Sequence, residues 1–170
     1  QTTGMHWWPN QTILAGRDEV AGGTWLGTNR EGKFAAITNL KENNNNKYQV
    51  SRGSLVTGFL ESKLSAKAYL EELEAEKEEY AGFNLIVGDK NGLFYLCNRL
   101  EGIFFISEGT HALGNLTLNA STKKAEAIKH DLNDILHEGF TAEKAFNVMK
   151  KEYGNLHEKT KKELQTRDGE

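Results

Sequence analysis

The stretch from Ile13 to Asn39 reads I-L-A-G-R-D-E-V-A-G-G-T-W-L-G-T-N-R-E-G-K-F-A-A-I-T-N, and the prediction of the fold starts from it. Two short apolar runs, residues 24–27 and 34–37, are separated by the segment 29–32, which ends in a glycine. A short polar connection of this kind between apolar runs predicts a β-hairpin. Gly22 and Gly23 stand directly before the first run, where they allow a positive φ or a close backbone approach.

The second strand of this predicted hairpin ends in the polar residues Thr38 and Asn39. Polar groups at a strand end are well placed to contact a ligand. The same residue types also form ordinary turns, so both interpretations stay open at this point.

Composition limits the function classes. The chain has 170 residues, 38% hydrophobic and 26% charged, which is typical of a soluble globular protein with one core. A formal net charge of −3 gives no basic surface for nucleic acid, and no apolar run is long enough to span a membrane. The single cysteine, Cys97, excludes an internal disulfide and indicates a reducing compartment, so a cytoplasmic location is expected.

Further elements are expected on both sides of the central stretch. Trp7 and Trp8 indicate a segment packed on the core, with ligand stacking as the alternative. Residues 55–60 predict a short helix. Arg52, beside its start, can reach a carboxylate or phosphate, or can form a surface ion pair. Ser65 is expected to cap a second helix that continues as far as Gly82.

The middle of the chain is expected to be β-rich. Residues 83–88 and 93–98 flank Asp89-Lys90-Asn91-Gly92, and Asn-Gly between apolar runs strongly favours a hairpin. Residues 103–106 predict a third strand. Because these strands are apolar on both faces, they are expected to lie centrally in a covered sheet, with Cys97 as a buried thiol.

The last third is expected to be helical. Ser121 is predicted to cap one helix, which ends near Gly139, and Thr141 is predicted to cap another. The polar tail, residues 154–170, is expected to be mobile or a marginal helix.

No familiar catalytic or metal motif is present. The chain lacks G-x-S-x-G, a P-loop, H-E-x-x-H, and G-x-G-x-x-G opening a helix. His130 and His137 can share a helical face, but no third ligand accompanies them, so a solvated pair is favoured. We therefore predict no catalytic residue and no metal ligand from the residues alone.

Five motifs, in the same order, resemble the transport-and-Golgi-organisation-2 family, also called the NRDE family. They are L-A-G-R-D…A-G-G-T-W-L-G…G-K-F-A-A-I-T-N (14–39), S-R-G-S-L-V with F-L (51–60), Y-A-G-F-N-L-I (80–86), C-N-R (97–99) and H-A-L-G-N (111–115). The resemblance covers residues 7 to 150.

The resemblance implies an α+β fold of the N-terminal-nucleophile hydrolase type. In that fold two mostly antiparallel sheets lie between helical layers, as a four-layer αββα sandwich. A single domain over residues 1–153 is expected, followed by the tail. Family members begin Met-Cys and end in further strands. Neither feature is found here, so the chain is expected to be truncated at both ends, with an incomplete sandwich and exposed sheet edges.

By the same resemblance, Asn39 and Asn115 fall where related hydrolases have pocket asparagines. Trp25 and Arg52, in neighbouring motifs, complete the expected ligand-binding set. Gly114 stands where the family commonly has serine, and residues 119–122 replace the usual D-x-P-W, so the pocket near Asn115 is expected to differ in detail.

The resemblance implies an intracellular protein that binds or traffics a small molecule, in haem handling or in lipid and membrane homeostasis. Haem or a lipid-related metabolite would then be a transported ligand, with no resident cofactor. Mitochondrial or Golgi association is expected if the source is eukaryotic. The alternative is an amide or ester hydrolase whose N-terminal Cys nucleophile is absent from this chain. A purely structural module is the third interpretation. The residues do not choose between these, nor do they select a haem ligand among His6, His111 and Cys97.

Overall fold

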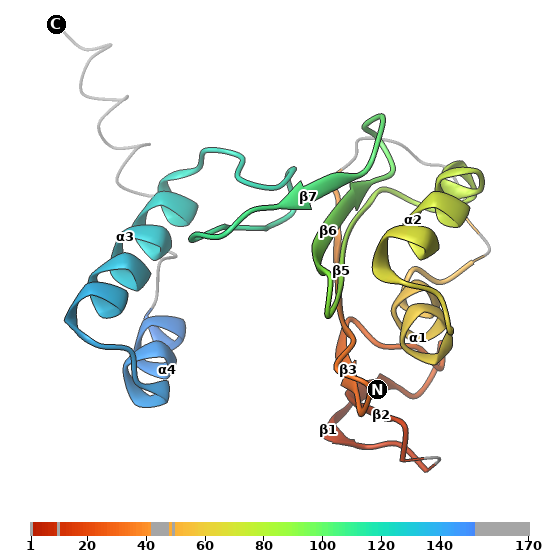
Figure 1. The fold of residues 1–170 in the computed structure, drawn as a ribbon, viewed down its shortest axis with the longest axis horizontal. Coiled ribbons are helices and arrows are strands. Elements are labelled where there is room, and N and C mark those ends of the chain that lie inside the picture. Colours follow the sequence, from red (N-terminus) through yellow and green to blue (C-terminus); the bar gives the residue numbers. More distant parts are fainter. Residues whose placement is uncertain (1, 10, 42–47, 49, 152–170) are drawn as a thin grey trace, which may run out of the picture. The chain divides into compact units, whose positions relative to one another are not determined.

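The computed structural model describes residues 2–9, 11–41, 48 and 50–151. In these residues seven strands form one antiparallel sheet and follow chain order across it (Figure 1). The strands are β1 (Thr2–Trp7), β2 (Ile13–Asp18), β3 (Leu26–Asn29), β4 (Phe34–Asn39), β5 (Phe83–Asp89), β6 (Gly92–Cys97) and β7 (Phe104–Ile106). The helices are α1 (Gly53–Glu61), α2 (Ala66–Glu74), α3 (Lys123–Glu138) and α4 (Ala142–Lys150), with a short 3-10 turn at Lys77–Glu79. The predicted α+β class with an antiparallel sheet is confirmed.

The described residues divide into two compact units. Residues 2–108 and 114–117 form the first unit, which contains the sheet, α1 and α2. Residues 109–113 and 118–151 form the second unit, with α3 and α4. The single domain over residues 1–153 stays a prediction, and the predicted tail, 154–170, lies outside the described residues.

The strand register sorts the side chains of the sheet into two faces, because directly paired residues of antiparallel strands point the same way. One row crosses five strands, and the next row points to the opposite face. The first row is Leu26, Ala36, Ile86, Tyr95 and Phe104. The second row is Gly27, Ala35, Val87, Phe94 and Phe105.

Helices α1 and α2 cover the face of the second row over β2 to β6 (Figure 1), while Phe105, at the β7 end of that row, stays 63% exposed. The core between them is apolar and fully buried, with Ile13, Ala15, Ala35, Leu85, Val87 and Leu96 from the strands and Val56, Phe59, Leu70 and Ala66 from the helices. Gly27 lets α1 lie close to β3: a Cβ there would lie 2.9 Å from Leu60 Cδ1, so the buried Leu60 side chain would have to shift. The apolar side chains whose spacing predicted the helix at residues 55–60 thus form its contact with the sheet.

The glycines before β3 form a close backbone crossing with the start of α1. A Cβ on Gly23 would lie 2.6 Å from the carbonyl carbon of Gly53, a separation no side chain can occupy. Gly22 adopts a φ of +75°, in the left-handed region. The Asp18 carboxylate accepts hydrogen bonds from the Ala21 and Val20 amides, and these two bonds hold the pKa of Asp18 below its usual value.

The β3–β4 connection also caps the C-terminal end of α1. The Lys33 ammonium, buried over the Phe59 ring, donates hydrogen bonds to the carbonyls of Phe59 and Ser62 at 3.3 and 2.5 Å. Asn29 Nδ2 donates to the Leu60 carbonyl at 2.8 Å. A cation and an amide therefore satisfy carbonyls that a helix end leaves unpaired.

Two predicted helix boundaries were wrong. Helix α2 begins after its Ser65 cap but ends at Glu74, not near Gly82. The 3-10 turn at Lys77–Glu79 follows, and the buried Asn98 amide binds the carbonyls of Lys77, Tyr80 and Ala81 after the helix has ended.

In α3 the capping side chain is Thr122, which accepts from the Ala125 amide; Ser121 was expected to cap this helix. The Thr141 cap of α4 and the end of α3 at Gly139 are confirmed.

The N-terminal segment is a strand that the sequence did not predict. Trp8 is buried in the core, as expected of a packed segment, whereas Trp7 is partly exposed and stacks against Arg30, whose guanidinium carbon is 4.0 Å from the ring centroid. The prediction of fully covered strands holds for the central strand β5 but is wrong for β6 at Leu93, which is 40% exposed, and for β7, where Phe104 and Phe105 are exposed.

The face opposite α1 and α2 is largely apolar, with Thr28, Thr38 and Asn84 as polar members, and on β3 to β7 it carries no charged side chain among the described residues. Its exposed members are Leu26 (45% exposed), Phe34 (38%), Leu93 (40%) and Phe104 (45%). We call the face that these four residues share the open face; Tyr95 and Ile106, on the same face, are buried. None of the described helices has the length and apolar character that crossing a bilayer requires.

Candidate functional site

Polar groups gather where β4 ends, at one edge of the open face. Residues 114–117 cross this end and are held by hydrogen bonds from β4 and the residues after it. Thr38 Oγ1 donates to the Gly114 carbonyl at 2.7 Å, and the Lys41 amide donates to the Asn115 carbonyl at 2.8 Å. Asn115 Nδ2 in turn donates to the Asn39 carbonyl at 2.8 Å. We call this cluster the β4-end site.

A fully buried amide lies beneath the β4-end site. Asn84, on β5, is paired with Thr38 across the sheet and has no exposed surface. Its Nδ2 donates to the Leu116 carbonyl at 2.9 Å and to Thr38 Oγ1 at 3.3 Å, and its Oδ1 accepts from the Tyr95 hydroxyl at 2.7 Å. Both the nitrogen and the oxygen of the Asn84 side chain thus have hydrogen-bonding partners, which favours a single orientation of this amide.

Asn39 and Asn115 meet at this end of the sheet through the backbone carbonyl of Asn39, whereas the Asn39 side chain lies in the alternation of Ala35 and Ile37, on the face that α1 and α2 cover. Asn39 and Asn115, 76 positions apart in sequence, are joined by a hydrogen bond, and both are exposed. The Trp25 carbonyl accepts from the Ile37 amide, so the exposed Trp25 stands two residues along β4 from Asn39. Their role in binding a ligand stays a prediction.

Arg52 reaches the same end of the sheet from the start of α1. Its Nη1 donates to the Gly82 carbonyl at 2.9 Å, and the same carbonyl accepts from the Leu40 amide at 2.9 Å. Part of the guanidinium is thus engaged by the backbone just before β5. Arg52 holds the strand ends together as well as contributing positive charge beside them.

Sequence reasoning missed Asn84 and Tyr95 as members of the site. Both lie inside apolar strands, Phe83–Asp89 and Gly92–Cys97, where a core position was the natural assignment. The available signal was the amide itself, since a polar side chain in the middle of a buried strand requires hydrogen-bonding partners.

Cys97 is fully buried, opposite Asn84 in the β5–β6 pair, which agrees with the prediction of a buried thiol. A thiolate nucleophile needs access to its substrate, so this cysteine is not a candidate nucleophile.

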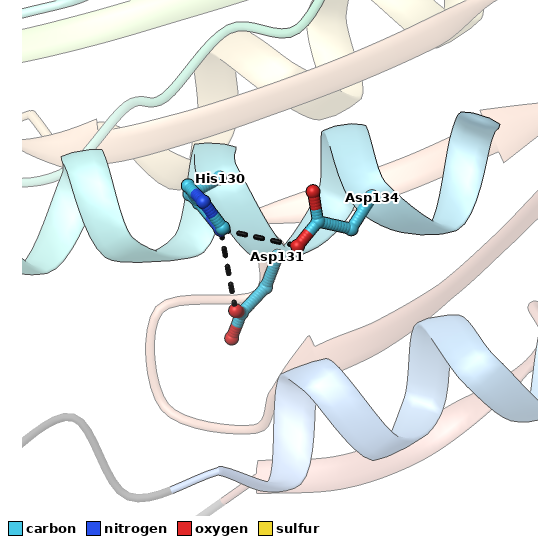
Figure 2. Close-up of side chains that lie close together, drawn as sticks. All are labelled: His130, Asp131 and Asp134. Atoms are coloured by element: carbon cyan, nitrogen blue, oxygen red, sulfur yellow. Dashed lines mark ion pairs between the residues drawn. The ribbon is translucent and has the colours of Figure 1, made fainter. Parts of the chain in front are cut away.

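The second unit holds a separate cluster of ligand-type side chains on α3 (Figure 2). His130 Nδ1 lies 3.2 Å from Asp134 Oδ2 and 3.9 Å from Asp131 Oδ1. One ligand atom from each residue lies within 4.8 Å of the others, so the three can hold a metal ion. Sequence reasoning paired His130 with His137 and overlooked the two aspartates.

Solvent and a competing cation weaken the case for metal at this cluster. The His130 and Asp134 side chains are 74% and 57% exposed, and Asp131 Oδ2 is ion-paired with Lys151 Nζ at 2.8 Å. A surface ion-pair network explains the geometry without a metal.

Another contact in the second unit involves His111, one of the three residues among which the sequence selects no haem ligand. Its Nδ1 is 2.9 Å from Asn119 Nδ2, and the Asn119 amide donates to the Ala112 carbonyl at 2.8 Å. Asn119 has a φ of +59°, which asparagine tolerates better than most residues. The histidine therefore helps to close this loop.

Comparisons with known proteins identify the family. The model of the Transport and Golgi organisation 2 family matches residues 1–169. The chain belongs to this family. Among curated relatives, it is 36% identical to the Transport and Golgi organization protein 2 homolog of Bos taurus over 127 residues, which is 69% of this chain and 46% of the relative.

The relatives from Mus musculus and Homo sapiens, with names of the same form, are each 35% identical over 127 residues, with the same coverage. The chain therefore spans about half the length of the curated relatives that it matches. The family resemblance seen in the five motifs is confirmed.

Proposed function

We propose that this member of the Transport and Golgi organisation 2 family binds and traffics an amphipathic small molecule, with haem or a lipid-related metabolite as the candidates. The single observation that carries the proposal is that the polar β4-end site borders the uncharged open face of the sheet. An amphipathic ligand needs both an apolar surface and a few fixed polar groups.

Particular residues supply each property. Leu26 and Phe34 offer apolar surface on the open face, and Trp25, opposite Ile37 just before β3, is an exposed aromatic ring near the same end of the sheet. Asn115 contributes an amide at the polar end, and Arg52 contributes a cation at the same end of the sheet but on the side of α1. Haem and fatty acids share a carboxylate attached to an apolar body, which matches this combination.

Titration of the 170-residue chain with hemin and, separately, with oleate tests the proposal. Saturable binding of hemin would shift its Soret band and quench tryptophan fluorescence. Three tryptophans contribute to the fluorescence, so Trp25→Phe is the matched control that removes the one beside the site. Saturation with only one of the two compounds identifies the source of the carboxylate. Saturation with neither would overturn the proposal.

Variants of the two asparagines separate binding from folding. Asn39→Ala and Asn115→Ala are expected to weaken binding at least fivefold, while the thermal midpoint changes by only a few degrees, because both side chains are exposed. Equal losses of stability without any change in binding would show that the two residues only form turns.

A separate measurement, labelling with an acylating electrophile, tests the hydrolase alternative. The one cysteine of this chain is buried in β6, so an acylating electrophile should not label it in the folded state. A protein that carries an accessible N-terminal Cys before this stretch would be labelled there if the family's pocket is catalytic.

A further inference from the structure

We infer that Asn84 is a positioning residue that fixes residues 114–117 against the end of β4 and so sets the geometry of the β4-end site. The inference rests on the proposed function for its link to ligand binding. The positioning itself rests only on the contacts of Asn84, Thr38 and the crossing segment.

The orientation of the Asn84 amide is determined by its partners. The Leu116 carbonyl can only accept a hydrogen bond, so the nitrogen of the amide must face it. The oxygen then faces the Tyr95 hydroxyl, which donates to it at 2.7 Å. Tyr95 is itself buried, so the donor that fixes the amide cannot be replaced by bulk water.

The same amide controls the hydroxyl of Thr38. Asn84 Nδ2 donates to Thr38 Oγ1, which directs the hydroxyl proton toward the Gly114 carbonyl. The carbonyls of Gly114 and Leu116 in the crossing segment thereby accept hydrogen bonds from Thr38 and Asn84 of the sheet. The intervening residue, Asn115, is the one whose side chain binds the Asn39 carbonyl.

Position 84 is therefore expected to act on a ligand only through Asn115. Since Asn84 has no exposed surface, a ligand on the sheet cannot contact it directly. Loss of its two donated hydrogen bonds would release the crossing segment while the helices and the remaining strand pairs stay formed.

Amide hydrogen exchange tests the positioning without any ligand. The reporter is the Lys41 amide, which donates to the Asn115 carbonyl. In Asn84→Asp an oxygen replaces the donor facing the Leu116 carbonyl, and Thr38→Val removes the hydroxyl with little change of shape. Each is expected to lower the protection of the Lys41 amide about fivefold to tenfold relative to α1 amides. Thr38→Ser should restore it.

The matched control is Asn98→Asp, which changes a second fully buried amide that binds other carbonyls. It is expected to destabilise the chain without selective loss of protection at Lys41. If Asn84→Asp does not fold, Thr38→Val and Thr38→Ser still decide the result. Unchanged protection of Lys41 in Thr38→Val would overturn the inference.

Binding completes the test. Thr38→Val is expected to raise the dissociation constant for hemin or oleate as much as Asn115→Ala does, and Thr38→Ser to return it within twofold of the parent. If the parent chain binds neither compound, the proposed function fails, and hydrogen exchange alone decides the positioning role. If the parent binds and Thr38→Val binds equally well, the link to the ligand is overturned.

Discussion

Lys33 illustrates how one charged residue can be part of the core of this protein. Its ammonium is buried, yet it binds the carbonyls of Phe59 and Ser62 and lies 4.7 Å from the centroid of the Phe59 ring. The charge lies at the C-terminal end of α1, where the helix dipole favours a cation. The hairpin signature G-K-F therefore has a structural role: it fixes α1 on the sheet.

Replacing Lys33 by methionine should lower the free energy of unfolding by about 2–3 kcal/mol, because carbonyls at the end of α1 lose their donor in a buried place. Urea denaturation measures the change. Lys67→Met is the control: this lysine is 64% exposed and pairs with Glu71 at 3.6 Å, so a change below about 0.5 kcal/mol is expected. Equal effects would contradict the role of Lys33.

Tyr69 makes the free energy of unfolding depend on pH in the alkaline range. Burial raises its pKa from 10.0 to about 12, and its hydroxyl donates to the Leu55 carbonyl. Between these two values the unfolded state has lost the phenol proton and the folded state keeps it. The folded state thus binds more protons, and the free energy of unfolding falls as pH rises.

Over that interval Tyr69 should contribute a loss of about 2 kcal/mol. Tyr69→Phe has no proton to lose, so its stability should fall less than that of the parent between pH 10 and 12. Chemical denaturation at several pH values measures both curves. Parallel curves would show that Tyr69 titrates normally.

Among the elements, the contact between the loop before β3 and the start of α1 depends on two glycines. Gly23→Ala would place a Cβ 2.6 Å from the Gly53 carbonyl carbon, and backbone on both sides leaves little room to relax. We expect a loss of about 2–4 kcal/mol, seen as a lower thermal midpoint by circular dichroism. Gly4→Ala, in β1 with no heavy atom within 4 Å of the added carbon, should be close to neutral. A neutral Gly23→Ala would contradict the close crossing.

The elements also show why sequence patterns predict some features and miss others. The turns at Gly32 and at Asn91-Gly92 were predicted correctly from the sequence. A hairpin turn depends on only a few neighbouring residues, here a short polar connection with a glycine that takes a positive φ. The non-helical course of the chain after α2 was missed because the Asn98 amide that binds it lies about twenty residues away in sequence.

The cap of α3 was missed for the opposite reason. Ser121 and Thr122 are adjacent residues of equal capping ability, and only the backbone geometry decides between them. In the candidate site, motif order brought out Asn39 and Asn115, whereas their support by Asn84 depends on pairing across the sheet, which no single stretch of sequence specifies.

At the scale of the whole molecule, the chain combines a well-covered sheet face with an open one. The helix-covered face contains residues of no measurable exposure, such as Leu85 and Val87. The open face keeps Leu26, Phe34 and Leu93 more than a third exposed. The predicted αββα arrangement, in which a further sheet covers such a face, gives this asymmetry a physical reason, because apolar surface of this kind is stable when it is removed from water.

Dye binding can test whether the open face is accessible in solution. We expect the 170-residue chain to bind anilinonaphthalene sulfonate, and Leu26→Lys with Leu93→Lys to lower the fluorescence at least twofold. Both positions already contact water, so the thermal midpoint should change by only a few degrees. Leu136→Lys, on the exposed surface of α3, is the control and should leave the fluorescence nearly unchanged. If instead the α3 variant lowers the signal and the double variant does not, the open face is covered in solution and the ligand proposed for it would need another site.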